Sequence, residues 1–159
     1  MLVGPLQISP RKLKQLPNIH LAGPKAHEEL PYYIRDFDVG IVPYLFNGYT
    51  ATVVPTKINE YLAMGKPVVS TDLPEVRAFN GKHGIIITSS NRPAEFVASI
   101  ERALSSPGED AVIDRRRTVA ALNDWEGCFE RMSHFIEREL RKKVRRELVR
   151  PSFLHSPPK

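Results

Sequence analysis

The sequence has little cysteine and no long apolar run, and each absence excludes a class of protein. Among its 159 residues Cys128 is the single cysteine, so no internal disulfide framework can form, as is usual in a reducing compartment. No stretch approaches the ~18 uninterrupted apolar residues of a transmembrane helix. The five histidines are scattered and lack the spacing of a metal site. We therefore expect a cytoplasmic protein that holds no metal ion and no resident cofactor.

The body of the chain also lacks an excess of positive charge. The formal net charge is +5, but residues 138–159 contain eight basic and two acidic residues, whereas residues 1–137 contain fifteen basic and sixteen acidic residues. The basic character is therefore confined to the C-terminal segment. This distribution argues against a domain whose whole surface binds nucleic acid.

The sequence does contain an alternation of short apolar runs and amphipathic segments. Strands are expected at residues 18–22, 39–43, 68–69 and 84–88, and helices at residues 27–37, 55–65 and 93–104. Residues 72–79 are expected to form a connection with a single helical turn. Strands that alternate with helices predict an α/β fold with a mostly parallel sheet.

Composition divides the chain into three parts. Residues 1–108 carry the α/β pattern, residues 109–150 have a helical pattern, and residues 151–159 (PSFLHSPPK) are expected to be a disordered tail. Leu2 and Val3 are followed at once by Gly4-Pro5, which resembles the end of a strand whose beginning is absent. We therefore expect the α/β domain to be incomplete at its N-terminus.

The helical part shows apolar residues at alternating spacings of three and four. The residues concerned are Leu122, Trp125, Phe129, Met132 and Ile136, with a break expected near residues 123–127. We expect Trp125 to pack against a neighbour and Cys128 to be a small buried residue. The basic segment 138–150 has two open interpretations, which are contact with an anionic membrane and a solvated helix end.

The stretch from residue 39 to residue 71 reads as strand, loop, helix and strand, and its loop is long for such a connection. Pro55 begins a helix whose free N–H groups favour an anion such as phosphate. Lys57 in the first turn would oppose the helix dipole unless a diphosphate were bound. Glu60 can accept hydrogen bonds from the vicinal hydroxyls of a ribose. The alternative is that Lys57 and Glu60 form an exposed ion pair.

The combined strings PTKINEYLAMGKPVVST, DFDVGIVPY and LPNIHLAGPKAHEELPYYIRDF are specific as a set. Together they resemble the C-terminal, donor-binding domain of GT-B glycosyltransferases, of the group 1, family 4 type. The resemblance covers residues 1–105 and implies a Rossmann-like half of a GT-B fold. It also implies hexosyltransferase-like transfer from a nucleoside-diphosphate sugar to a glycan or lipid-linked acceptor in polysaccharide biosynthesis. A separate N-terminal domain would complete the enzyme, so we expect little activity from this chain alone.

The resemblance also implies roles for individual residues. Glu60 matches the second glutamate of the family's pair and would hold the ribose. The backbone from Thr52 to Thr56, which includes Val54 and Pro55, would approach the diphosphate, with Lys57 as an added cation. The remaining matches are Lys25 in the turn that contacts the base, and Asn47 and Gly48 near the donor sugar. The family's first glutamate falls at position 52, where this chain has Thr52.

Two other functions remain open from the sequence. One is a sugar-nucleotide epimerase of the same fold, and the other is a non-enzymatic α/β remnant or partner-binding module. Nucleic acid is not an expected partner. No residue is assigned as a catalytic base, because the half of the enzyme that would supply it is absent from the resemblance. Besides the nucleotide sugar and the separate N-terminal domain, the inner face of a membrane is an expected partner, which residues 138–150 would contact peripherally.

Overall fold

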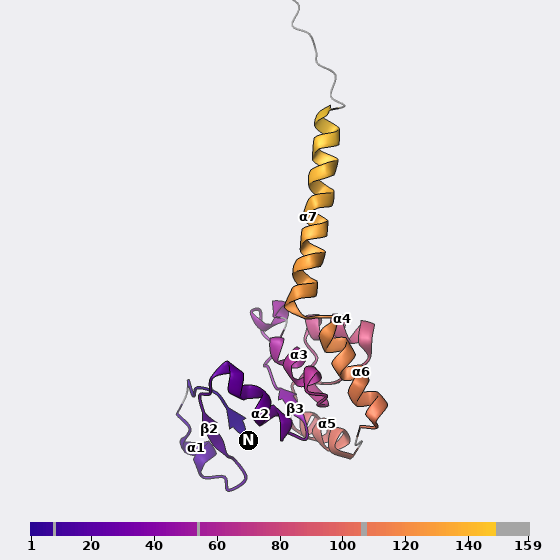
Figure 1. Ribbon diagram of the computed structural model, residues 1–159. Helices are drawn as coiled ribbons and strands as arrows, with labels where there is room; N and C mark the ends of the chain where they lie inside the picture. Colours follow the sequence, from indigo (N-terminus) through magenta and orange to yellow (C-terminus); the bar gives the residue numbers. More distant parts are fainter. Residues whose placement is uncertain (8, 54, 106–107, 149–159) are drawn as a thin grey trace, which may run out of the picture. The chain divides into compact units, whose positions relative to one another are not determined.

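The strands that the structure describes form two parallel sheets (Figure 1). The computed structural model describes residues 1–7, 9–53, 55–105 and 108–148. One sheet pairs β1 (Leu2–Val3) with β2 (Leu21–Gly23). The other has the order β3-β4-β5, formed by β3 (Gly40–Val42), β4 (Val68–Thr71) and β5 (Ile86–Ser89). All these pairs are parallel, which confirms the predicted α/β fold with a parallel, Rossmann-like arrangement.

Helices connect and follow the strands. Before the central sheet lie α1 (Arg11–Lys14), η1 (His27–Glu29) and α2 (Leu30–Arg35). Within and after it lie η2 (Thr50–Thr52), α3 (Thr56–Ala63), α4 (Pro74–His83), α5 (Pro93–Ser105), α6 (Asp110–Ala121) and α7 (Trp125–Leu148). The single helix expected over residues 27–37 is therefore divided into a 3₁₀ turn and a short α-helix.

The connection expected after β4 is in fact the ten-residue helix α4. Pro74 begins this helix, where its missing N–H costs nothing. Gly84 ends it at φ 58°, and its N–H donates to the carbonyl of Asn80 over 2.7 Å. Val76 is the one fully buried side chain of α4, so the helix carries little of the apolar periodicity on which the sequence prediction depends.

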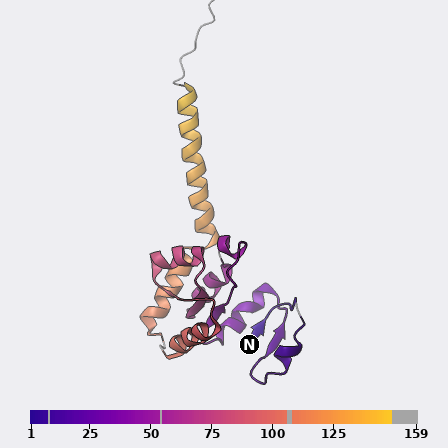
Figure 2. The ribbon, with the colours of Figure 1, turned by 180° about the vertical axis from the view of Figure 1, so that it is seen from behind.

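The core lies between the central sheet and the helices α3 and α6. Its buried residues are Val42, Ile58, Leu62, Val68, Leu73, Val76, Ile86, Val119 and Ala120. Successive residues of a strand face opposite sides, so Val69 lies on the other face of the sheet from Val68. Helix α5 packs against β4 and β5 (Figure 2). It contributes the buried Ser99 and Ala103. Both faces of the sheet are thus covered, as a parallel sheet requires.

Gly65 ends α3 and contacts α6 through its backbone carbonyl. Its φ is 72°, its N–H donates to Leu62, and the N–H of Lys66 donates to Tyr61, which is a Schellman motif. Arg116 of α6 donates to the Gly65 carbonyl over 3.1 Å. The helix expected over residues 55–65 therefore ends at a glycine with left-handed backbone.

The chain divides into two units, Met1–Ala121 and Leu122–Lys159. This division differs from the expected boundary after residue 108. The physical reason is that Val119 and Ala120 of α6 belong to the core of the first unit. That contact depends on residues far apart in sequence, which composition does not reveal.

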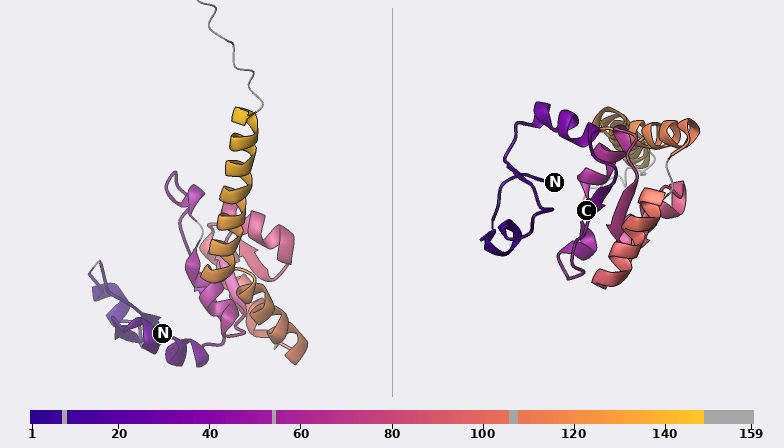
Figure 3. Two further views of the ribbon diagram at one scale, coloured as in Figure 1. Left: turned by 45° about the horizontal axis from the view of Figure 1, so that its top comes forward. Right: turned by 90° about the horizontal axis from the view of Figure 1, so that it is seen from below.

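The second unit contains α7, a single continuous helix (Figure 3). The break before it lies at residues 122–124, where Asp124 accepts a hydrogen bond from the Gly127 N–H over 2.7 Å. Trp125 packs against the Phe129 ring, with 6.2 Å between the ring centroids, although it is 74% exposed. Cys128 is partly exposed, so the expectation that it is buried is wrong. Within the described ranges, no helix is long and apolar enough to cross a membrane. The expected tail at 151–159 lies outside the described residues.

Candidate functional site

The carboxyl ends of β3, β4 and β5 lie at one edge of the central sheet, because these strands are parallel and in register. Open α/β folds bind their ligands at this edge. The loop after β3 leads to α3, the residues after β4 are Asp72 and Leu73, and the loop after β5 contains Ser90 and Asn91. The sequence-predicted residues Asn47, Gly48, Thr52, Pro55, Thr56, Lys57 and Glu60 lie in the loop that follows this edge or on the helix that it leads to.

The loop after β3 is folded on itself through Asn47 and Thr50. The Thr50 N–H donates to Oδ1 of Asn47 over 2.9 Å, and the Asn47 N–H donates to Oγ1 of Thr50 over 2.9 Å. The Thr50 hydroxyl also donates to the carbonyl of Leu45 over 2.6 Å. Thr50 is buried, so this reciprocal pair fixes the backbone of the loop. Asn47, predicted to lie near the donor sugar, uses its side-chain oxygen within the loop.

Asn91, from the loop after β5, ties the neighbouring loop in place. With its amide oriented to satisfy both groups, it donates to the carbonyl of Tyr44 over 3.2 Å and accepts from the N–H of Phe46 over 3.0 Å. The two loops at the sheet edge are therefore one hydrogen-bonded structure.

The N-terminus of α3 offers N–H groups to this edge. Pro55 precedes the helix with extended backbone (φ −71°, ψ 106°), and no side chain of the described residues caps it. The N–H of Ile58 is satisfied by the carbonyl of Pro55 over 3.0 Å, which leaves the N–H groups of Thr56 and Lys57 without a described partner. Free N–H groups and the positive end of the helix dipole together favour an anion.

Lys57 and Glu60 lie on α3 without partners in the described parts of the chain. Lys57 is exposed and Glu60 is partly exposed, and neither side chain has a hydrogen bond or ion pair with another described side chain. The alternative in which the two form an ion pair is therefore not what the structure shows. Burial raises the pKa of the neighbouring Tyr61 hydroxyl, and the negative charge of Glu60 raises that pKa further.

Thr52 departs from the family's glutamate and is engaged locally. Its hydroxyl donates to the carbonyl of Tyr49 over 3.1 Å within the 3₁₀ turn η2. Gly48 is exposed, and the position of a Cβ there would be open space. The loop therefore presents a small, exposed surface at Gly48 and Thr52 rather than a carboxylate.

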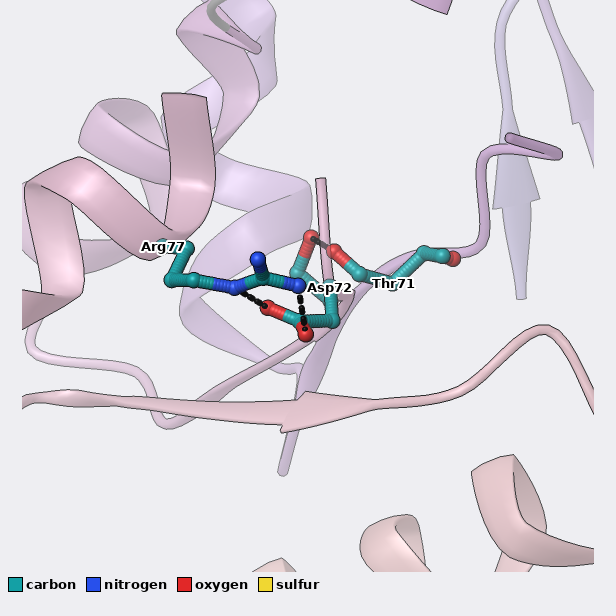
Figure 4. Close-up of polar contacts among 4 residues, drawn as sticks. Thr71, Asp72 and Arg77 are labelled. Atoms are coloured by element: carbon teal, nitrogen blue, oxygen red, sulfur yellow. Dashed lines mark hydrogen bonds and ion pairs between the residues drawn. The ribbon is translucent and has the colours of Figure 1, made fainter. Parts of the chain in front are cut away.

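A charge pair that the sequence did not predict closes the end of β4 (Figure 4). Arg77 of α4 donates two hydrogen bonds to the Asp72 carboxylate, from Nε to Oδ1 over 3.2 Å and from Nη2 to Oδ2 over 2.5 Å. This pairing raises the pKa of the Arg77 guanidinium above its ordinary value. The Asp72 N–H donates to the Ser89 carbonyl over 2.8 Å, so the pair fixes α4 to the ends of two strands. Its only sequence signal was an acidic residue directly after an apolar strand.

Lys25 is not joined to the other predicted residues by any described contact. Its ammonium group lies over the Tyr33 ring, 5.2 Å from the ring centroid, and the interaction with Tyr33 raises the pKa of Lys25. Val54 lies outside the described residues. Pro55, Thr56, Lys57 and Glu60 share α3 or its start, as predicted from the sequence. In the part of the chain that the structure describes, no group of His, Cys, Asp or Glu side chains could hold a metal ion.

Comparison with known proteins agrees with this geometry. The family model described as glycosyl transferases group 1 matches residues 1–106. A Bacillus subtilis (strain 168) protein named "Putative teichuronic acid biosynthesis glycosyltransferase TuaH" is 33% identical over 128 residues, which is 80% of this chain and 32% of the relative. The chain thus spans about one third of the length of that relative. It belongs to the group 1 glycosyl transferases.

Proposed function

We propose that this group 1 glycosyltransferase chain binds the nucleoside-diphosphate part of a sugar donor at the N-terminus of α3. The diphosphate would meet the free N–H groups at Thr56 and Lys57 and the Lys57 ammonium group. The Glu60 carboxylate would accept hydrogen bonds from the two ribose hydroxyls. Gly48 and Thr52 would border the donor sugar, and the turn that carries Lys25 would contact the base.

One observation supports this assignment most directly: the start of α3 has no described side-chain cap while Lys57 and Glu60 have no described partners. A cation in the first turn of a helix is unfavourable unless an anion lies beside it. A diphosphate supplies that anion. Family membership supports a nucleotide sugar as the source of the diphosphate.

The same groups would assist the transfer step. When the sugar leaves, negative charge grows on the terminal phosphate of the nucleoside diphosphate. Fixed N–H groups and a cation at that phosphate stabilise the transition state more than the ground state. Because Asn47, Thr50 and Asn91 hold the adjoining loop, these groups need little rearrangement when the donor binds.

We further propose that the acceptor and the catalytic base belong to residues beyond this chain, so that the chain alone transfers little sugar. The chain corresponds to about one third of its relative. The name of that relative refers to teichuronic acid biosynthesis, which supports a glycan or lipid-linked glycan acceptor for this protein as well. We also propose that the protein uses a donor pool in the cytoplasm.

Isothermal titration of the 159-residue chain tests the donor site. We expect UDP or GDP to bind, and inorganic pyrophosphate to bind more weakly. Lys57→Gln should weaken both ligands by about tenfold, as expected for one lost charge-assisted contact. Glu60→Ala should weaken only the nucleotide, because pyrophosphate has no ribose.

Two variants serve as controls, because each makes the same substitution at an exposed position away from the proposed donor site. Lys82→Gln removes an exposed lysine from the last turn of α4, and Glu101→Ala removes an exposed glutamate from α5. Neither should change nucleotide affinity by more than about twofold. A chain that binds neither UDP nor GDP would contradict the proposal and favour a non-enzymatic remnant. Efficient sugar transfer by the isolated chain would contradict the assignment of acceptor and base to other residues.

A further inference from the structure

Helix α7 carries a row of large apolar side chains that no other described part of its own unit covers. The residues of this apolar stripe are Trp125, Phe129, Met132, Ile136, Leu140 and Val144, and each is more than half exposed. Scattered exposed apolar residues are ordinary, but a continuous row along one helix marks a surface for docking. The family model ends at residue 106, so this helix lies outside the matched family domain.

The opposite side of the same helix becomes strongly basic toward its C-terminus. Residues 125–137 contain one basic and three acidic residues, whereas residues 138–148 contain six basic and two acidic residues. At about 100° per residue, Arg138 and Arg145 lie roughly 180° around the helix from Ile136. A shallow depression on this side is lined by His134, Glu137, Arg138, Arg141, Lys142 and Arg145.

The width of the apolar stripe distinguishes between possible occupants. A second copy in a coiled coil would need the alternation of three and four to continue through positions 139 and 143. Glu139 and Lys143 are charged, so the narrow seam stops after Ile136. Leu140 and Val144 instead turn around the helix and widen the apolar face to roughly 120°, which fits a flat surface better than a partner helix.

An apolar face with aromatic residues and a Lys/Arg-rich opposite face is the pattern of a helix that lies in a lipid interface. Trp125 and Phe129 suit the boundary between headgroups and acyl chains. The guanidinium of Arg138 lies 5.2 Å from the Phe135 ring centroid, so its stem follows the apolar flank while its charge stays accessible. The excess positive charge favours anionic lipids.

We propose that α7 docks the chain on an anionic lipid bilayer. The apolar stripe would be inserted below the headgroups, and the basic side chains among residues 138–145 would lie on the water-facing side, where the negative surface potential of the bilayer attracts them. This inference does not depend on the donor site, because it rests on a helix that carries none of its residues. It would place the glycosyltransferase domain at a membrane surface through a helix that does not itself cross the bilayer.

Trp125, the single tryptophan of the chain, reports directly on the proposal. We expect its emission to shift to shorter wavelength when vesicles of phosphatidylcholine with about one third phosphatidylglycerol are added. Co-sedimentation with these vesicles should be at least about tenfold stronger than with pure phosphatidylcholine, and it should weaken as salt rises. Gln substitutions at Arg138, Arg141 and Arg145 should remove most of this dependence on lipid charge.

A matched pair of variants separates insertion from charge. Ile136→Glu places a carboxylate in the apolar stripe, and His134→Glu places the same group on the opposite face. We expect Ile136→Glu to abolish the emission shift and to weaken binding at least tenfold, while His134→Glu weakens binding by no more than about threefold. Far-UV circular dichroism shows whether both variants keep their helix content.

Three results would overturn the proposal. One is no emission shift and no co-sedimentation with anionic vesicles. Another is equal loss of binding in the Ile136→Glu and His134→Glu variants, which would mean that binding depends on charge alone and not on insertion of the apolar stripe. The third is a dimer in solution that buries Trp125 without lipid and is broken by Ile136→Glu, since a second copy would then cover the apolar stripe.

Discussion

Helices α3 and α7 both carry apolar residues at helical spacing, but only α3 buries them. In α3, Ile58 and Leu62 are among the least exposed side chains of the chain, and Leu62 has 0% exposed surface. In α7, Trp125 is 74% and Ile136 is 51% exposed. The apolar pattern therefore predicts that a helix forms, while the presence of a covering sheet or helix depends on residues elsewhere in the chain.

The two helices also differ in what stabilises their ends. Helix α3 begins without a described side-chain cap and ends in a Schellman motif against α6. Directly before α7, Asp124 accepts a hydrogen bond from the Gly127 N–H of its first turn. Packing thus stabilises α3, whereas local interactions stabilise the start of α7. The uncapped start of α3 is the feature that makes it available to an anion.

The largest expected effect comes from truncating the same side chain in both helices. Leu62→Ala should lower the free energy of unfolding by about 2–5 kcal/mol, because it removes buried methyl groups and leaves a cavity. Leu140→Ala, on the exposed face of α7, should change it by less than about 0.5 kcal/mol. Urea denaturation followed by far-UV circular dichroism measures both. Similar losses in the two variants would mean that the apolar stripe of α7 is covered.

A smaller effect tests the approach of β3 to α3. A Cβ at Gly40 would overlap the ring of Tyr61, so Gly40→Ala should cost about 1–3 kcal/mol through overpacking. Gly48→Ala is the matched control, since a Cβ there would meet open space. The double variant with Tyr61→Leu should recover part of the loss in urea denaturation. No recovery would show that the cost at Gly40 arises from something other than the Tyr61 ring.

The region from β3 to β4 was the most predictable from sequence. Its strands are β-branched runs, and Pro55 and Gly65 mark the two ends of α3 by their own backbone preferences. Helix α4 was missed as a full helix because Val76 is its one buried residue. Periodicity detects an element only when several of its residues face the core.

The part of the candidate site that lies at the start of α3 was predictable, because Pro55 marks that start in the sequence. Lys57 and Glu60 were identified because they lie in the first two turns of this helix. The Asp72–Arg77 pair and the Asn91 contacts join separate loops, so they depend on how the strands are ordered in space. The Asn47–Thr50 pair is local, and its Asn-x-x-Thr spacing is a signal that could have been recognised.

The comparison of helix ends predicts a further difference. Asp124→Ala removes the side-chain acceptor at the start of α7 and should cost about 0.5–2 kcal/mol of helix stability. Thr56→Ala at the start of α3 should cost less than about 0.5 kcal/mol, because no described side chain caps that helix. The helical signal at 222 nm should fall, before the main unfolding transition, in Asp124→Ala only. A fall in both variants would contradict the distinction between packing and local stabilisation.

The smallest expected effect concerns the protonation of Tyr61. Burial is the main cause that raises the pKa of its hydroxyl, and the charge of Glu60 is the second. Because the folded-state pKa lies above the unfolded value of roughly 10, this group's stabilising contribution is present below that pH and is lost as pH rises through the folded pKa. Absorbance at 295 nm, as the difference between the wild type and Tyr61→Phe, follows the phenolate.

The two helices should also differ in how strongly the pKa values of their titratable groups depend on salt. On α7, a hydrogen bond from Lys142 is the main cause that lowers the pKa of Glu139, with Arg138 contributing as well. Salt screens such exposed pairs, so the Glu139 pKa should rise toward its ordinary value in about 0.5 M salt. The Tyr61 pKa should change less, since burial does not depend on salt, and Glu60→Gln should lower it without restoring the ordinary value. A Tyr61 pKa that returned to its ordinary value in Glu60→Gln would show that charge, rather than burial against the core, governs this face of α3.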